Sequence, residues 1–196
     1  MNAALRELRR RYPWPVERPN VPEDWHGWLC PETAAMLQRH LSADAQVVVE
    51  TGSWLGMSAR HILCHAPRAT LVCIDTWQGS PEHHENPAWR QRLPKLYQTF
   101  CRNLWETRAR IVPMRTDAID GLAELHALGI APDLVYVDDL HEYDHVRREL
   151  TLLDAQWHTV RLVGDDYNQM DVQRAVQTAA AATGRTLSHN TAAWSL

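Results

Sequence analysis

The sequence predicts an α/β protein with a doubly wound, mostly parallel sheet of seven strands that closes with a C-terminal antiparallel hairpin. Short runs rich in Val, Ile and Leu alternate with segments of helical periodicity from residue 45 to residue 184. Most of these runs are continuously apolar, which is typical of parallel strands covered by helices on both faces. Right-handed crossovers between such strands give a doubly wound sheet.

The elements follow in a regular order along the chain. Residues 1–30 combine a short basic helix with a Pro-rich connector, and 30–41 form a helix because Pro31 suits a first turn. We predict strands at 45–50, 70–75, 109–115, 133–138 and 159–166, and helices at 57–66, 95–106, 118–129, 143–156 and 171–184. The tail 185–196 is expected to form the hairpin, turning at Asn190-Thr191. Residues 1–44 are assigned to an N-terminal helical cap and 45–196 to the main unit, within a single structural domain overall.

Composition excludes several classes of protein. The net charge of −4 argues against a nucleic-acid binder that acts through bulk positive charge. No apolar run approaches the ~18 residues of a membrane span, and the polar first residues do not resemble a secretory signal. The four cysteines form no C-x-x-C pair, so we expect a cytoplasmic protein without disulfides.

The residues that follow each strand are the candidates for a binding site, because ligands of such sheets bind at the carboxyl ends of the strands. Glu50 ends the first strand, and Gly52 and Gly56 permit a tight turn into the next helix. Asp75 ends the second strand, where an acid commonly binds ribose hydroxyls but can also form a turn.

The later strands end in further acids. After the third strand, Asp117 and Ala118 could meet an adenine edge, although Asp117 could equally cap a helix. Asp138 follows the fourth strand and Asp165 and Asp166 the fifth. Carboxylates converging there would repel one another unless they were protonated or bound to a cation, and oxygen ligands favour Mg²⁺, Ca²⁺ or Mn²⁺.

The segments "VVVETGSWLGMS", "LVCIDTW", "DLVYVDDLHEYDHV" and "VGDDYNQMDVQRAV" together resemble class I S-adenosylmethionine (SAM)-dependent methyltransferases. The closest likeness is to small-molecule O-methyltransferases of the macrocin and mycinamicin type, over about residues 45–180. The resemblance implies the Rossmann-like methyltransferase fold, SAM as cofactor and Mg²⁺ as a possible second one. The partners would be a small-molecule acceptor and possibly a second copy of the chain, with no nucleic acid and no membrane.

The resemblance also implies roles for individual residues. Asp138, Asp165 and Asp166 would bind the metal, and His141, three residues after Asp138, would be the catalytic base. In some relatives the base is an Asp two residues after the first metal ligand, where this chain has Leu140, so the role falls to His141 or another group. The implied cofactor-binding residues are Glu50, Gly52, Ser53, Gly56, Ser58, Asp75, Thr76, Trp77, Asp117, Ala118 and Asp138.

Three other functions stay open at this point. The stretch "HEYDH", residues 141–145, matches the H-E-x-x-H pattern of zinc hydrolases, but it follows a strand directly and no clear third ligand appears downstream. A SAM-binding scaffold without methylation activity is a second alternative. A nicotinamide dehydrogenase is a third, which the glycine spacing disfavours. The insertion 77–94 is expected to be either a lid over the acceptor or a surface loop.

Overall fold

The computed structural model describes residues 3–196 and contains one seven-stranded sheet in the order β3-β2-β1-β4-β5-β7-β6. The first five strands are parallel, and β7 pairs antiparallel with β5 and with β6. The strands are β1 (Val47–Thr51), β2 (Thr70–Asp75), β3 (Ile111–Arg115), β4 (Leu134–Val137), β5 (Arg161–Gly164), β6 (Ser188–His189) and β7 (Trp194–Ser195). The predicted fold class and the C-terminal hairpin are therefore confirmed.

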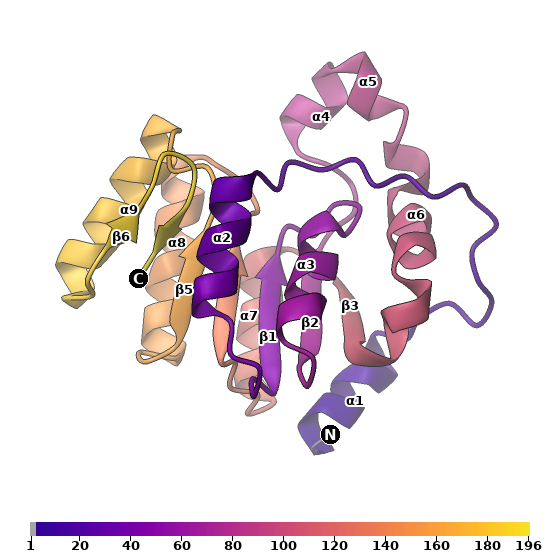
Figure 1. Cartoon of the computed structure of the whole chain (residues 1–196), viewed down its shortest axis with the longest axis horizontal. Helices are drawn as coiled ribbons and strands as arrows, with labels where there is room; N and C mark the ends of the chain where they lie inside the picture. Colours follow the sequence, from indigo (N-terminus) through magenta and orange to yellow (C-terminus); the bar gives the residue numbers. More distant parts are fainter. Residues whose placement is uncertain (1–2) are drawn as a thin grey trace.

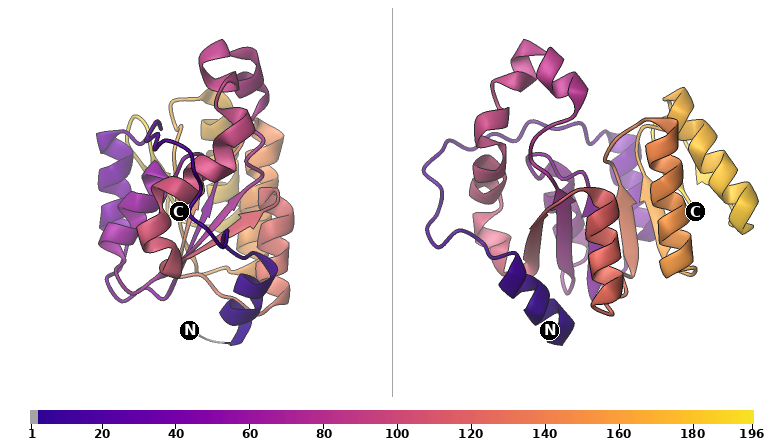
Figure 2. Two further views of the ribbon diagram at one scale, coloured as in Figure 1. Left: turned by 90° about the vertical axis from the view of Figure 1, so that its right-hand side faces the viewer. Right: turned by 180° about the vertical axis from the view of Figure 1, so that it is seen from behind.

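Helices cover both faces of the sheet (Figures 1 and 2). On one face lie α2 (Pro31–His40), α3 (Met57–His65) and α6 (Leu96–Asn103); on the other lie α1 (Ala3–Arg11), α7 (Ala118–Ala127), α8 (Tyr143–Gln156) and α9 (Met170–Thr183). Successive residues of a strand point to opposite faces. Val47 and Val49 accordingly join the core beneath α7 and α8, whereas Val48 joins the core beneath α2 and α3.

The hairpin completes the sheet through a close contact. Trp194 of β7 is buried against β5, and a Cβ atom added to Gly164 would lie 2.2 Å from its ring. Glycine at the end of β5 therefore makes room for the indole. Trp194 Nε1 also donates a hydrogen bond to the Asp165 carbonyl, which ties the hairpin to the loop after β5.

The N-terminal segment packs onto the sheet domain at several points. Leu5 and Leu8 of α1 are buried in the core on the α7 side, and Tyr12 donates a hydrogen bond to Glu124 of α7. The connector then crosses the carboxyl edge of the strands on its way to α2 (Figure 1). Trp14 stacks on Phe100 along this path. The described part of the predicted cap, residues 3–44, thus packs against the core of the main unit.

The insertion after β2 is helical and not a simple loop. It forms α4 (Pro81–Glu85), α5 (Pro87–Arg90) and a 3₁₀ turn (Leu93–Lys95), and a second 3₁₀ segment (Trp105–Arg110) precedes β3. Ser80 and Asn86 precede the two Pro residues at the helix starts, and both positions favour helix initiation. Among residues 3–196, no helix combines the length and apolarity needed to cross a membrane.

Candidate functional site

The site is centred where the strand order reverses, between the adjacent parallel strands β1 and β4. Gly52 follows β1 with a φ of +78°, and a Cβ atom placed on it would lie 1.8 Å from the Asp138 carbonyl oxygen. The two loops therefore approach each other as closely as backbones can, and only glycine permits both the approach and the left-handed conformation. This contact brings the predicted cofactor-binding turn and the first acid of the predicted metal site together.

Glu50 lies beneath the turn and is fully buried. Ser53 Oγ donates a 2.5 Å hydrogen bond to its Oε2, whereas its buried Oε1 has no hydrogen-bond partner among the described residues. Burial disfavours the charged form and raises the pKa of Glu50 to about 7, and the contacts with the Ser53 and Ser58 hydroxyls and the Cys73 thiol, which lower the pKa, only partly offset this. The free oxygen is a candidate acceptor for a donor group on a ligand.

Asp75 holds the neighbouring loops in place. Its Oδ2 accepts a 2.8 Å hydrogen bond from the amide of Trp54 and its Oδ1 a 2.6 Å bond from the amide of Trp77. Burial raises the pKa of Asp75 to about 6, although the two hydrogen bonds by themselves lower it. A carboxylate offers about four lone-pair positions, so ribose hydroxyls could still bind. Both Trp residues have positive φ, a conformation that the Asp75 carboxylate stabilises by accepting their amides.

The other predicted cofactor residues differ in how accessible they are. Trp77 is buried against Tyr97 and Phe100, so its ring belongs to the wall of the core. Asp117 is exposed and caps α7 by accepting a 3.0 Å hydrogen bond from the Asp120 amide, which was the alternative role for this residue. The remaining members are Ser53, Ser58 and Ala118, which are buried, Thr76, which is half-buried, and Gly56, the N-cap of α3. Their cofactor contacts stay predictions.

Acidic and imidazole groups meet at the ends of β4 and β5. One ligand atom each from Asp138, His141 and Asp166 lies within 4.8 Å of the others. His141 Nε2 lies 2.9 Å from Asp166 Oδ2. Burial raises the pKa of Asp138 well above its usual value, and the charges of Asp165 and Asp166 raise it further. Burial lowers the pKa of His141, but its contact with Asp166 outweighs this and the net shift is upward.

Asp165, the third predicted metal ligand, is held by other groups. Its Oδ1 accepts hydrogen bonds from Thr33 Oγ1 at 2.6 Å and from the amide of Asp166 at 2.9 Å. Tyr136 Oη lies 3.4 Å from its Oδ2 and 3.2 Å from Asp138 Oδ2, so the buried phenol joins the two acids. Thr33 belongs to α2 and Tyr136 to β4, and neither is among the residues predicted for the site. A polar ring within the otherwise aliphatic strand "LVYV" was the one available signal.

The two histidines of "HEYDH" bind different acids. His141 precedes α8, which begins at Tyr143, whereas His145 lies within it, 3.0 Å from Asp139 and 3.9 Å from Glu149. Glu149 is fully buried and accepts a 2.8 Å hydrogen bond from Thr51. The arrangement of a zinc hydrolase, with both histidines on one helix face and converging on one ion, is therefore not formed by the described residues.

Aromatic rings cover the site. His83 of α4 packs on Trp54 with ring centroids 4.3 Å apart and on Trp28 at 5.6 Å, and Trp89 of α5 contacts both His83 and Trp28. Figure 1 shows α4 and α5 above the carboxyl edge of the sheet. Beneath the rings, a cavity of about 30 Å³ is lined by residues of the β1 loop, the connector and Asp138. Ligand pockets usually measure ~300–1,000 Å³, so a nucleoside can enter only if this cover moves.

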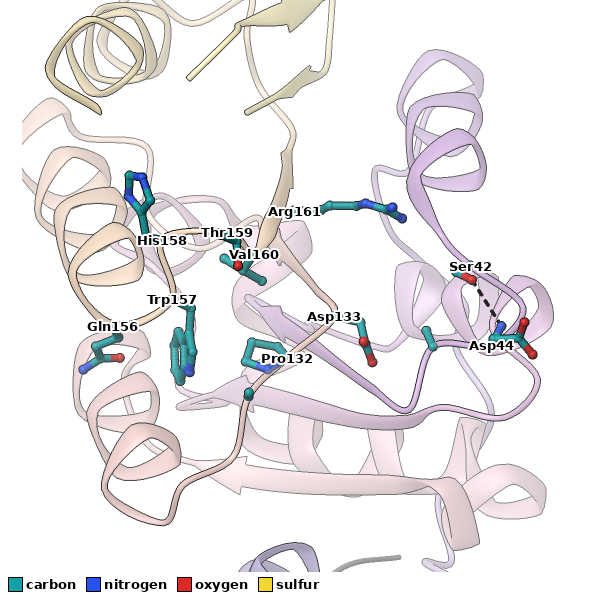
Figure 3. Close-up of a pocket in the computed structure, with 12 residues that line it drawn as sticks. Ser42, Asp44, Pro132, Asp133, Gln156, Trp157, His158, Thr159, Val160 and Arg161 are labelled. Atoms are coloured by element: carbon teal, nitrogen blue, oxygen red, sulfur yellow. Dashed lines mark hydrogen bonds between the residues drawn. The ribbon is translucent and has the colours of Figure 1, made fainter. Parts of the chain in front are cut away.

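A larger hollow of about 710 Å³ lies at the opposite, amino edge of the strands (Figure 3). Its acids are already engaged: Asp133 accepts hydrogen bonds from the amides of Gln46 and Val47, and Asp44 forms an ion pair with Arg68. Ligands of doubly wound sheets bind at the carboxyl edge. The smaller cavity is therefore the candidate functional site.

A family model described as a methyltransferase domain matches residues 49–167, which is more than half of the chain. The chain belongs to this methyltransferase family. The match runs from β1 to the loop after β5, so it includes the turn at Gly52 and the acids of both later loops. No curated protein matches the methyltransferase by sequence.

Solved methyltransferase structures share the fold. The O-methyltransferase TomG from Streptomyces achromogenes, involved in tomaymycin synthesis and solved with SAM, is 17% identical over 100% of this chain and 90% of that one, with a TM-score of 0.59. CalS11, a TDP-rhamnose 3′-O-methyltransferase of calicheamicin biosynthesis, is 15% identical over 84% and 76%, with a TM-score of 0.55. Precorrin-6y C5,15-methyltransferase from Geobacter metallireducens is 12% identical over 89% and 82%, with a TM-score of 0.58. At these identities the likeness shows the fold of the methyltransferase and not its acceptor.

Proposed function

We propose that the protein transfers a methyl group from SAM to a hydroxyl oxygen of a small molecule, with the help of a divalent cation. The observation that supports this proposal is the contact of Gly52 with Asp138, because the predicted cofactor turn of this methyltransferase then lies directly beside an Asp-rich centre. Methyl transfer needs the cofactor and the acceptor oxygen to be held in line. A centre that binds the acceptor next to the cofactor turn meets this requirement.

The residues around the turn fit SAM by their chemistry. Glu50 has a buried, unpaired carboxylate oxygen, and Trp54 Nε1 is buried without a hydrogen-bond partner among residues 3–196. The first turn of α3, preceded by Gly56, has no side-chain cap, so its amides are free for a carboxylate. We assign these groups and Asp75 to the cofactor, which when bound supplies an electrophilic methyl group.

The acids at the ends of β4 and β5 fit a divalent cation, because Asp138, Asp165 and Asp166 would otherwise leave three carboxylates close together in a half-buried site. A cation held there lowers the pKa of a nearby hydroxyl. The imidazole of His141 stands at the edge of this centre, with its Nε2 atom 2.9 Å from Asp166 Oδ2, where it can accept a proton from a hydroxyl bound beside the cation. We therefore assign His141 to this centre.

We propose that residues 77–94 act as a lid. The ring contacts of His83 and Trp89 with Trp28 close the site, and the Arg92–Asp24 ion pair at 2.8 Å fastens the far end of the lid to the connector. Opening these contacts enlarges the cavity of about 30 Å³ to admit cofactor and acceptor. A closed lid would exclude water during transfer.

The small cavity leaves little room for an acceptor beside the cofactor and so favours a second candidate, a SAM-binding scaffold protein of the same fold that does not methylate. The two functions differ in whether bound SAM is consumed. Calorimetric titration with S-adenosylhomocysteine, with and without Mn²⁺ or Mg²⁺, tests cofactor binding, and a screen for methyl transfer then separates the enzyme from the scaffold. Absence of binding would reject both.

The same titration tests the residue assignments. We expect Asp75→Ala to lose cofactor binding, and Asp138→Asn to lose the metal effect while it keeps most of the cofactor affinity. Asp171→Asn, an exposed acid in the first turn of α9, is the matched control and should change neither. Release of S-adenosylhomocysteine in a screen of hydroxylated small molecules would then establish the reaction.

Location and assembly complete the proposal. We propose a cytoplasmic enzyme, because the thiols of Cys73 and Cys101 are free and buried, as expected for a chain that folds under reducing conditions. A homo-oligomer remains part of the proposal, and light scattering of the purified protein tests it.

A further inference from the structure

The geometry of the Asp-rich centre differs from a set of three carboxylates. Two atoms bound to one ion at ~2.0–2.2 Å can lie no more than ~4.4 Å apart. Among the His, Cys, Asp and Glu residues that the structure describes, Asp138, His141 and Asp166 form a group whose ligand atoms all lie within 4.8 Å of one another, so that small side-chain rotations bring the three within that limit. In this group the imidazole of His141 takes the place of the Asp165 carboxylate, which the resemblance implies as the third metal ligand.

His141 is placed to act as a metal ligand. Its Nε2 atom is buried and lies 2.9 Å from Asp166 Oδ2, an ion-pair contact whose geometry is not that of a regular hydrogen bond. A nitrogen and a carboxylate oxygen at this separation can both bind one ion that lies ~2.0–2.2 Å from each of them.

The carboxylate of Asp165 is already hydrogen-bonded to other groups of the protein. Its Oδ1 accepts two hydrogen bonds, from Thr33 and from the Asp166 amide, and its Oδ2 faces the Tyr136 hydroxyl. These bonds hold the backbone of Asp166, which has a φ of +58°, and so fix the direction of the Asp166 side chain. Asp165 therefore has the contacts of a residue that positions a metal ligand.

We propose that Asp138, His141 and Asp166 bind one divalent transition-metal ion, and that Asp165 positions this set without binding the ion. One nitrogen and two carboxylates favour Mn²⁺, Fe²⁺, Co²⁺ or Zn²⁺ over Mg²⁺, which prefers oxygen ligands alone. This refines the metal centre of the proposed function, but it does not require that methyl transfer occurs. It also means that Nε2 of His141 is occupied by the ion, so that another group takes the acceptor proton.

Pulsed electron paramagnetic resonance of the protein loaded with Mn²⁺ tests the proposal directly. We expect ¹⁴N couplings from a bound imidazole in the wild type and their loss in His141→Asn. His145→Asn is the matched control, because His145 lies four residues away and contacts Asp139. This variant should keep the couplings, and Asp165→Asn should keep them as well.

Metal titrations supply the second readout. We expect the wild type to bind Mn²⁺ at least tenfold more tightly than Mg²⁺, and His141→Asn to lose at least tenfold of the Mn²⁺ affinity. Mn²⁺ bound without ¹⁴N coupling in the wild type would overturn the proposal and return His141 to the role of base. Absence of any metal binding would also overturn it. Both results leave S-adenosylhomocysteine binding, and thus the rest of the proposed function, to be judged separately.

Discussion

Replacement of Gly52 by alanine tests the closest contact of the site. The new Cβ atom would lie 1.8 Å from the Asp138 carbonyl oxygen and 2.9 Å from the Asp139 Cα atom, and these are backbone atoms that no side-chain rotation can move. The backbone at Gly52 is also left-handed, with φ at +78°. The left-handed conformation costs alanine about 1–2 kcal/mol and overpacking about 1–3 kcal/mol. We expect the free energy of unfolding to fall by about 2–5 kcal/mol.

The glycines at 129 and 184 offer a matched control for the conformational part. Both have positive φ, +68° and +71°, and a Cβ atom on either would meet nothing within 4 Å among the described residues. Gly129→Ala should therefore lose only the ~1–2 kcal/mol of backbone strain. The difference between the two variants isolates the contact between the β1 loop and the β4 loop.

Thermal and chemical denaturation measure these differences. For a protein of this size, about 2–5 kcal/mol corresponds to a fall in melting temperature of about 4–20 °C. Calorimetry with S-adenosylhomocysteine should show weaker binding for Gly52→Ala and unchanged binding for Gly129→Ala. If the two variants melted within a degree of each other, the close approach of the two loops would be wrong, and with it the position of the site.

Three further predictions concern the surroundings of the site. Thr33→Val removes the hydrogen bond to Asp165 and leaves the volume unchanged, so we expect chemical denaturation to show a loss of about 1.5–3 kcal/mol. Burial raises the pKa of Glu149 from 4.5 to about 7, so the folded state holds this proton more tightly and the free energy of unfolding falls as pH rises through that interval. Thermal melts between about pH 5 and pH 8 measure this fall in the free energy of unfolding, and Glu149→Gln should make it smaller by up to about 3 kcal/mol. If the variant had the same pH profile as the wild type, the raised pKa of Glu149 would be wrong. His83→Ala removes three ring contacts and should speed amide hydrogen exchange in the lid about tenfold, whereas the exposed His84→Ala should not; equal rates would argue against a lid held by His83.

The sequence predicted the order and type of the main elements well because their signals are local. The strand at 70–75 coincides with β2, and α8 has the predicted bounds 143–156. Apolar runs of strand length between amphipathic helices leave few ways to bury both faces of a sheet. The position of the acids after β4 and β5 follows from this topology, since parallel strands end at the same edge.

The lid could not be predicted in the same way. Residues 77–94 contain turn residues and no apolar periodicity, yet they fold into α4 and α5. These helices are short, and their stability depends on the contacts of His83 and Trp89 with Trp28 in the connector, more than fifty residues earlier. A pattern that spans only one segment does not contain that information.

The sequence by itself determined the sheet, the turn at Gly52 and the set of acids that reach the carboxyl edge. Only the tertiary structure decided which of these groups face one another. Asp165 turns toward Thr33, which is 132 residues away in the chain, while Asp166, in a left-handed conformation, turns toward His141. The direction of a side chain depends on backbone angles and on partners from distant segments, and neither is fixed by local hydrophobic periodicity.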